Sequence, residues 1–148
     1  MSFPKFSLQN VLDLRHGKVE LHEIELGKLL AVHQETENLL YSLEEYQECL
    51  LNQLSDAQSD DFDLTRINLL RQNIVQAAQH IESVKLALLK QSSDIEDKRA
   101  ELVGAKQSEE TLEILKRKRN EAYTAEQIQI EAHLQDDIYI ARAFRNQQ

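Results

Sequence analysis

The scarcity of helix-breaking residues is the feature that most constrains what this 148-residue chain can fold into. Its one proline is Pro4 and it has three glycines, so nothing after the first few residues forces a helix to end. Hydrophobic residues make up 41% of the chain and aromatic residues only 5%. This composition is typical of long helices. It argues against Rossmann, P-loop and barrel folds, which use glycine in turns and phosphate loops.

Charge and cysteine content narrow the class of protein further. The chain has 26 acidic and 17 basic residues, a net charge of -9, which argues against a general nucleic-acid binder. Its single cysteine, Cys49, cannot form an internal disulfide, and its acidic neighbours disfavour a reactive thiolate. No apolar run approaches the roughly 20 residues of a membrane span, and the N-terminus lacks the layout of a signal peptide. We therefore expect a cytoplasmic protein that does not insert into membranes.

A hydrophobic seam with alternating steps of three and four residues indicates a first helix over residues 7–54. Eight of its 13 positions are apolar, a spacing typical of a helix packed against one or two partners. Neighbouring apolar residues, which we expect to widen this stripe, are Val11, Val32, Leu39 and Tyr46. The seam itself consists of Leu12, Arg15, Val19, His22, Leu26, Leu29, His33, Thr36, Leu40, Leu43, Gln47, Leu50 and Leu54.

A second seam with the same stepping indicates a second helix over residues 64–146. Ten of its first 12 positions are apolar or alanine. The next apolar pair, Leu112 and Leu115, leads us to expect a slip in phase between residues 104 and 109. The seam before that slip consists of Ile67, Leu70, Ile74, Ala77, Ile81, Val84, Leu88, Gln91, Ile95, Lys98, Leu102 and Ala105.

The segment between the two helices, residues 55–63, is polar and rich in helix-capping residues. We interpret it as a turn, with Asp61 or Asp63 capping the second helix. The predicted fold is therefore all-α: residues 1–148 form one antiparallel two-helix coiled coil, a long helical hairpin. A turn centred near Gln58 places Leu12 opposite about Gly104.

The second helix is the longer one, so residues from about 112 onward have no partner within the predicted hairpin. This overhang keeps an apolar stripe, which needs another surface to cover it. Residues 116–148 carry a net charge of +1, whereas the rest of the chain is acidic. The overhang begins with the basic run Lys116-Arg117-Lys118-Arg119. We interpret it as a surface for another protein.

The sequence offers no assembly of catalytic groups, so we predict no enzyme activity and no cofactor. A metal centre within a helical bundle needs Glu-x-x-His pairs, and the nearest approach to one is Asp13 with His16. His22 and His33 share the first seam but lie about 16 Å apart along a helix, too far to share a metal ion. We interpret these two histidines as polar seam residues that either relax the packing or specify register.

Both ends of the chain resemble the FliJ family of flagellar export proteins. Residues 5–15 read Lys-Phe-Ser-Leu-Gln-Asn-Val-Leu-Asp-Leu-Arg, with the aromatic, the Leu-Gln pair and the Leu-x-x-Arg run of that family's opening. Residues 115–119 resemble the family's basic run. The matching features beyond it are Tyr123, Glu126, Glu131, Asp136, Asp137 and Ile138. Asp137 stands where glutamate is usual in the family.

The resemblance implies a coiled-coil stalk of the flagellar type III export apparatus, similar in fold to the stalk of rotary ATPases. Such a protein is a monomer when free, and it works at the cytoplasmic face of the membrane at the flagellar base. Its implied partners are the export ATPase hexamer, the export gate membrane protein and export chaperones. Two alternatives stay open: the stalk of a virulence-type secretion system, and an unrelated scaffold that dimerises through its overhang.

The resemblance also suggests two sets of contact residues. The stretch around residues 43–47 resembles the part of the first helix that contacts the gate, and a second-helix face is placed beside it. These gate candidates are Leu39, Leu43, Tyr46, Leu50, Ile74, Ala78 and Ile81. The ATPase candidates lie in the overhang, and they are Lys116, Arg117, Lys118, Arg119, Tyr123, Asp136 and Asp137.

Overall fold

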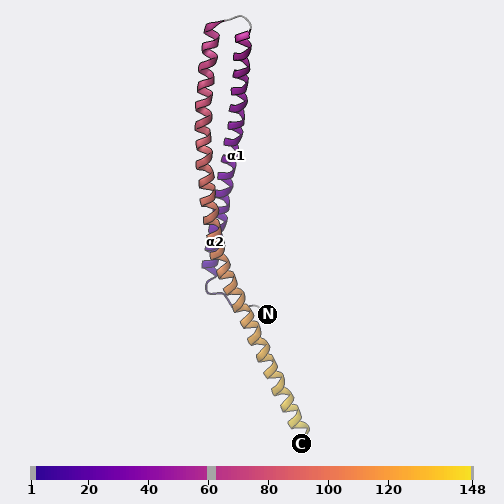
Figure 1. Ribbon diagram of the computed structural model, residues 1–148. Coiled ribbons are helices and arrows are strands. Elements are labelled where there is room, and N and C mark those ends of the chain that lie inside the picture. Colours follow the sequence, from indigo (N-terminus) through magenta and orange to yellow (C-terminus); the bar gives the residue numbers. More distant parts are fainter. Residues whose placement is uncertain (1–2, 60–62, 148) are drawn as a thin grey trace. The chain divides into compact units, whose positions relative to one another are not determined.

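The computed structural model describes residues 3–59 and 63–147. Within them it contains two α-helices and no strand: α1 spans Gln9–Ser59 and α2 spans Leu64–Asn146 (Figure 1). The helices have 51 and 83 residues. The predicted all-α hairpin with a longer second helix is confirmed. Neither described helix has a stretch that is both long and apolar enough to span a membrane.

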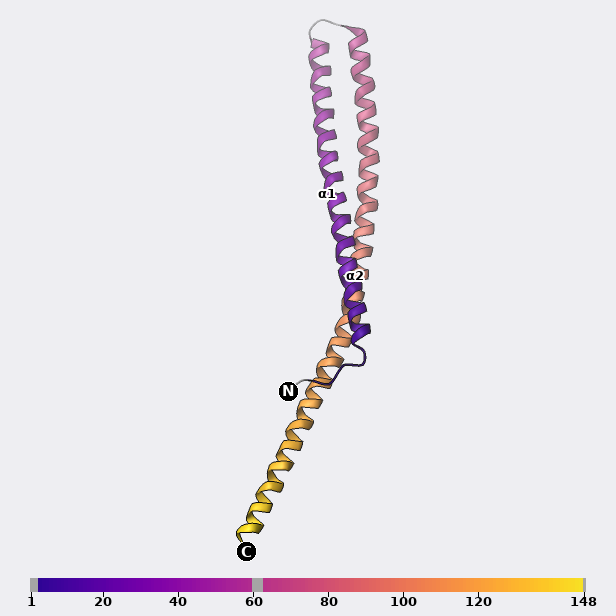
Figure 2. The same cartoon turned by 180° about the vertical axis from the view of Figure 1, so that it is seen from behind.

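The chain divides into two compact units, which we name by their contents. The turn unit is Leu21–Leu102, and the terminal unit combines Met1–Glu20 with Val103–Gln148. Within the turn unit, the segments of α1 and α2 lie side by side in both views (Figures 1 and 2). The contacting residues run in opposite directions along the two helices, so the pairing is antiparallel.

The core of the turn unit is a row of apolar side chains between the helices. Its centre comprises Leu50 and Ala57 from α1 with Ile67, Leu70 and Ala77 from α2. All 13 positions of the first predicted seam and all 12 of the second are buried or half-buried. The period of three and four residues therefore identified the interface along its full length. The residues expected to widen the first stripe are exposed instead: Val11, Val32, Leu39 and Tyr46.

The turn is shorter than its composition predicts, because α1 continues through residues 55–59. Ala57 is buried in the core, and the Ser59 hydroxyl donates to the Ser55 carbonyl at 2.8 Å, so both favour the helix. Asp63 caps α2 as predicted: its carboxylate accepts from the backbone N–H of Thr65 at 3.1 Å and of Arg66 at 3.4 Å. The alternative cap, Asp61, lies outside the described residues.

The longer α1 changes the pairing register of the terminal unit. Gln9 contacts Lys116, and His16 contacts Glu109. Leu12 lies between these two contacts on α1, so it faces the part of α2 around Leu112, which is also buried. The predicted pairing of Leu12 with Gly104 is wrong, because it followed from placing the turn at Gln58. The segment from residue 112 onward is therefore partly covered, and the expected start of the overhang is too early.

The predicted slip in the second seam is also absent. The same steps of four and three continue from Ala105 through Glu109 to Leu112, and all three are at least half-buried. Leu115, by contrast, is 47% exposed. The polar character of Glu109 hid this seam position, because its carboxylate meets a histidine of α1 instead of an apolar side chain. Glu109 is therefore a seam position of α2 within the terminal unit.

Replacing Ile67 tests the core of the turn unit. Ile67 is 3% exposed, so Ile67→Ala leaves a cavity and should lower the free energy of unfolding by about 2–5 kcal/mol. Leu69 is a matched control, since it lies two residues away on the same helix and is 57% exposed. Urea titration followed by circular dichroism measures both variants. Equal losses for Ile67→Ala and Leu69→Ala would contradict this assignment of the core.

Candidate functional site

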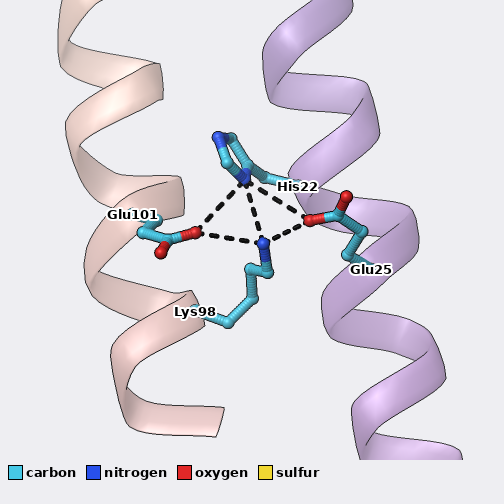
Figure 3. A network of polar contacts seen from close by, with 4 residues as sticks. All are labelled: His22, Glu25, Lys98 and Glu101. Atoms are coloured by element: carbon cyan, nitrogen blue, oxygen red, sulfur yellow. Dashed lines mark hydrogen bonds and ion pairs between the residues drawn. The ribbon is translucent and has the colours of Figure 1, made fainter. Parts of the chain in front are cut away.

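Polar residues of the seam form a cross-helix cluster in the turn unit (Figure 3). The ammonium group of Lys98 on α2 donates to Glu25 of α1, and to Glu101 at 3.0 Å. It also lies 3.4 Å from Nδ1 of His22, which comes from α1. One lysine thus bridges a histidine and a carboxylate of the facing helix.

The electrostatics of this cluster favour its charged form. The hydrogen bonds from Glu25 and Glu101 raise the pKa of Lys98 above its ordinary value. The hydrogen bond from Lys98 in turn lowers the pKa of Glu25. Both groups therefore stay ionised over the physiological range. A shift in the pairing of the helices would separate these charges, so the cluster specifies register.

A second polar layer lies nearer the turn, around His33. Its Nδ1 is 3.3 Å from the side-chain oxygen of Gln91 on α2, and its Nε2 is 3.0 Å from Glu37. Gln91 also donates to the Thr36 hydroxyl at 3.0 Å. His22 and His33 thus contact the facing helix, as the interpretation of polar seam residues requires. Among the described residues, no group of histidine, cysteine or acidic side chains is arranged to hold a metal ion.

The terminal unit has its own polar contacts between α1 and α2. Nδ1 of His16 lies 2.6 Å from the Glu109 carboxylate, and Nε2 lies 3.1 Å from Glu20. Arg15 donates to the main-chain carbonyl of Ser108 at 2.8 Å. Both ring nitrogens of His16 face carboxylate oxygens, and only the doubly protonated imidazolium can donate to both. The hydrogen bond and charge of Glu109, with a smaller effect of Glu20, raise the pKa of His16.

The residues before α1 form a non-helical N-terminal arm, residues 3–8, that ends in a turn at residues 7–8 and lies against α2 (Figures 1 and 2). Phe6 is the buried anchor of the arm, with 7% of its surface exposed. The ring of Phe3 packs edge-on against Tyr123, with 6.2 Å between the centroids and 67° between the planes. Sequence reasoning noted Phe6 only as part of a family motif. The spacing of two aromatics around Pro4, just before a helix, is the signal for a packed arm.

The arm and the start of α1 occupy two members of the basic run. The guanidinium group of Arg119 lies over the Phe6 ring at 6.0 Å from its centroid and donates to the Ser7 hydroxyl at 3.4 Å. Lys116 donates to the side-chain oxygen of Gln9 at 2.8 Å. Arg117 and Lys118 are exposed, and Arg117 lies 4.0 Å from Glu121 on its own helix. The run is therefore divided into an inner pair and an outer pair.

The docked arm is only slightly more stable than the undocked arm. Burying one phenyl ring contributes about 1.5–3 kcal/mol. The other residues of the arm are exposed, so their burial does little to offset the conformational entropy lost when the segment is ordered. The contacts of Phe3 and Arg119 add to the stabilisation, but each is partly solvated. Undocking of the arm is therefore an accessible motion of the terminal unit.

An open groove of about 600 Å³ lies beside the arm. Its apolar lining includes Phe3, Leu12, Ala125 and Ile128, and charged side chains such as Arg117 and Glu121 edge it. Beyond it, every described residue of α2 from Ile128 to Gln147 is exposed. Asp136 and Asp137 of the predicted ATPase set lie in this exposed segment. Its large apolar side chains are Ile128, Ile130, Leu134, Ile138, Tyr139, Ile140 and Phe144.

The predicted gate residues divide between the surface and the core of the turn unit. Leu39 and Tyr46 are 43% and 50% exposed, so a partner has access to them. Leu50 and Ile81 are buried between the helices, at 4% and 5% exposed. The remaining three candidates, Leu43, Ile74 and Ala78, are half-buried. Leu50 and Ile81 thus belong to the helix interface, whereas Leu39 and Tyr46 belong to the exposed face of α1.

Taken together, these features define a helical-hairpin protein whose distinctive residues lie along open helix surfaces and not in an enclosed pocket. The chain belongs to the FliJ family: the model of this family, described as Flagellar FliJ protein, matches residues 4–148. Membership makes the chain a component of the flagellar export apparatus, and the family is non-catalytic. No curated protein and no solved structure matches the chain.

The contacts of His16 give the hairpin a dependence on pH. A raised pKa means that its stabilisation is fully present below the ordinary value of about 6.5 and is lost as pH rises through the raised value. We expect the chain to be more stable at about pH 6 than at about pH 8, and His16→Gln to reduce this difference. Thermal melts at the two pH values measure it.

His80 provides the control for this prediction, because it is exposed on α2. His80→Gln should leave the difference between the two pH values as it is in the parent chain. An unchanged difference in His16→Gln would mean that the contacts with Glu109 and Glu20 do not stabilise the fold.

Proposed function

We propose that this protein is the coiled-coil stalk of the flagellar export apparatus, which binds the export ATPase hexamer through the terminal unit. The observation that carries the proposal is the exposed apolar surface of α2 from Ile128 to Phe144. Long helices seldom keep such a surface free, since exposed apolar patches mark sites of association. The family resemblance supplies the nature of the partner, a ring that grips a long helix.

The charge distribution supports this choice of surface. The turn unit has seven basic and sixteen acidic residues, whereas the terminal unit has ten of each. The net charge of -9 thus resides in the turn unit. An acidic partner is repelled by the turn unit and is steered to the terminal unit, where Arg117 and Lys118 point outward. These two residues are better candidates for the first contact than Lys116 and Arg119, each of which already donates one hydrogen bond to Gln9 or Ser7.

We further propose that the exposed face of α1 in the turn unit contacts the export gate. Leu39 and Tyr46 lie seven residues apart, which places them on the same side of α1, and both are exposed. Tyrosine is favoured at protein interfaces because its ring is apolar and its hydroxyl is polar. The proposed location is the cytoplasmic face of the membrane at the flagellar base. The protein is a monomer when free, and it assists export chaperones there.

Two changes to the terminal unit test the ATPase contact. A chain that ends at Gln127 loses the exposed apolar segment, and Arg117→Glu with Lys118→Glu reverses the outer pair of charges. Both should weaken binding to the cognate export ATPase by tenfold or more, while the thermal midpoint changes little. The effect of charge reversal should be larger at low salt, where screening is weakest. Surface plasmon resonance with the immobilised ATPase measures both.

A matched control reverses two basic residues on α2 of the turn unit, Lys85→Glu and Lys90→Glu. This variant changes the net charge by the same amount and should bind the ATPase as the parent chain does. If the chain ending at Gln127 binds with unchanged affinity, the segment beyond it is not the contact.

Replacing Tyr46 tests the gate contact. Tyr46→Ala should weaken binding to the cytoplasmic part of the export gate by about tenfold, as expected for an aromatic anchor at an interface. Tyr41→Ala is the control, since Tyr41 is also exposed on α1 but lies five residues away, on a different side. Isothermal titration measures binding, and circular dichroism checks the helix content. A loss of stability that matches the loss of binding would instead assign Tyr46 to the fold.

A further inference from the structure

We propose that the N-terminal arm is a strap that competes with the export ATPase for the surface of α2 around residues 116–123. The inference rests on the proposed function, and it concerns the regulation of that same surface. The arm contacts Arg119 and Tyr123, and the start of α1 contacts Lys116. All three belong to the set of residues that the family resemblance suggests for the ATPase contact.

The geometry of the contacts makes the competition direct. Arg119 has its guanidinium group over the ring of Phe6 and one N–H directed to Ser7, so a carboxylate cannot take that side of the group while the arm is docked. Phe3 covers the edge of the Tyr123 ring. The arm therefore covers one side of the Arg119 guanidinium group and one edge of Tyr123, although the Arg119 side chain as a whole is exposed. It leaves Arg117 and Lys118 accessible.

The arm also contacts the part of α2 that continues its seam beyond the end of α1. In α2, the half-buried positions continue past Leu112 through Lys116, Asn120, Tyr123 and Gln127, in steps of four, four, three and four residues. The interface of α1 with α2 thus ends under the arm, and beyond it the apolar residues of α2 are exposed. A partner that covers the exposed segment and extends along the seam toward Leu112 meets the arm first.

Two sets of contacts then give a binding reaction in two steps. The outer pair and the exposed apolar segment are available in the free protein and allow the first encounter. Full contact with Arg119 and Tyr123 requires that the arm leave, because the arm and the partner use the same groups. The apparent dissociation constant of the free chain equals the intrinsic constant divided by the fraction of molecules in which the arm is undocked. A docked fraction near nine-tenths corresponds to a tenfold effect.

Phe6→Ala removes the buried anchor of the arm and is the main test. The variant should bind the immobilised export ATPase about tenfold more tightly than the parent chain, mostly through faster association. The matched control is Leu8→Ala, which shortens an exposed side chain at the end of the same arm and should leave the affinity unchanged. Weaker binding by Phe6→Ala would overturn the strap, because it would show that the arm contributes to the surface that binds the ATPase.

Amide hydrogen exchange in the unaltered chain provides a second readout. The N–H of Gln9 donates to the Phe6 carbonyl at 3.1 Å, so its exchange reports on the join between arm and helix. Exchange at residues 5–9 should increase when the ATPase is added. A decrease would show that the arm is held in the complex, and it would overturn the proposal.

The state of the arm in the free protein is tested without any partner, by iodination of tyrosines. Phe3 of the arm packs on Tyr123, so Tyr123 should react more slowly than the exposed Tyr139 in the parent chain, and the difference should shrink in Phe6→Ala. Equal rates in the parent chain would mean that the arm is not docked, and would overturn the strap alone. If the arm is docked but neither chain binds the ATPase, the proposed function fails and the role of the strap fails with it. If the parent chain and Phe6→Ala bind the ATPase with equal affinity, the proposed function is retained and only the strap is overturned.

Discussion

The pairing register of α1 and α2 is the constraint on which the other features of this structure depend. An apolar seam with a period of seven residues favours pairing but tolerates a shift by one heptad, since leucine meets leucine again. The polar residues remove this freedom. A shift would take Lys98 away from Glu25 and leave charged groups without partners at the helix interface. Each unit has its own polar contacts, so each unit fixes its own register.

The pairing register also determines which side chains of α2 are left exposed to solvent. Because α1 begins at Gln9 and pairs with the region of Lys116, the last 30 residues of α2 (146 − 116) have no facing helix within the terminal unit. The arm extends the cover by about two turns of α2, up to Tyr123. A shift of the pairing would move the end of this cover and expose a different set of side chains. The candidate binding surface is thus a result of pairing distances set elsewhere in the hairpin.

The sequence predicted the seams well because one period governs them. Every predicted seam position is at least half-buried, including the polar ones such as Arg15 and His22. The wrong predictions came from residues whose chemical type is unusual for the position that they occupy in the structure. Ser55 and Ser59 suggested a turn, but the buried Ala57 between them continues the helix. Glu109 suggested a break in the seam, but it pairs with His16 across the interface. The arm was missed because a non-helical segment has no period, and its packing depends on where α2 passes.

The division into two units bears on how the hairpin opens. Gly17 and Gly27 on α1, and Gly104 on α2, lie within a few residues of the boundaries, and each faces open space. Glycine inside a helix costs about 1 kcal/mol relative to alanine, and these three side-chain positions add no packing. Local helix opening near the boundaries is therefore easier than within the apolar core around Ile67. We therefore expect that loss of helix in the terminal unit stops near these glycines and leaves the turn unit folded, so that amide exchange in the two units follows two different opening reactions.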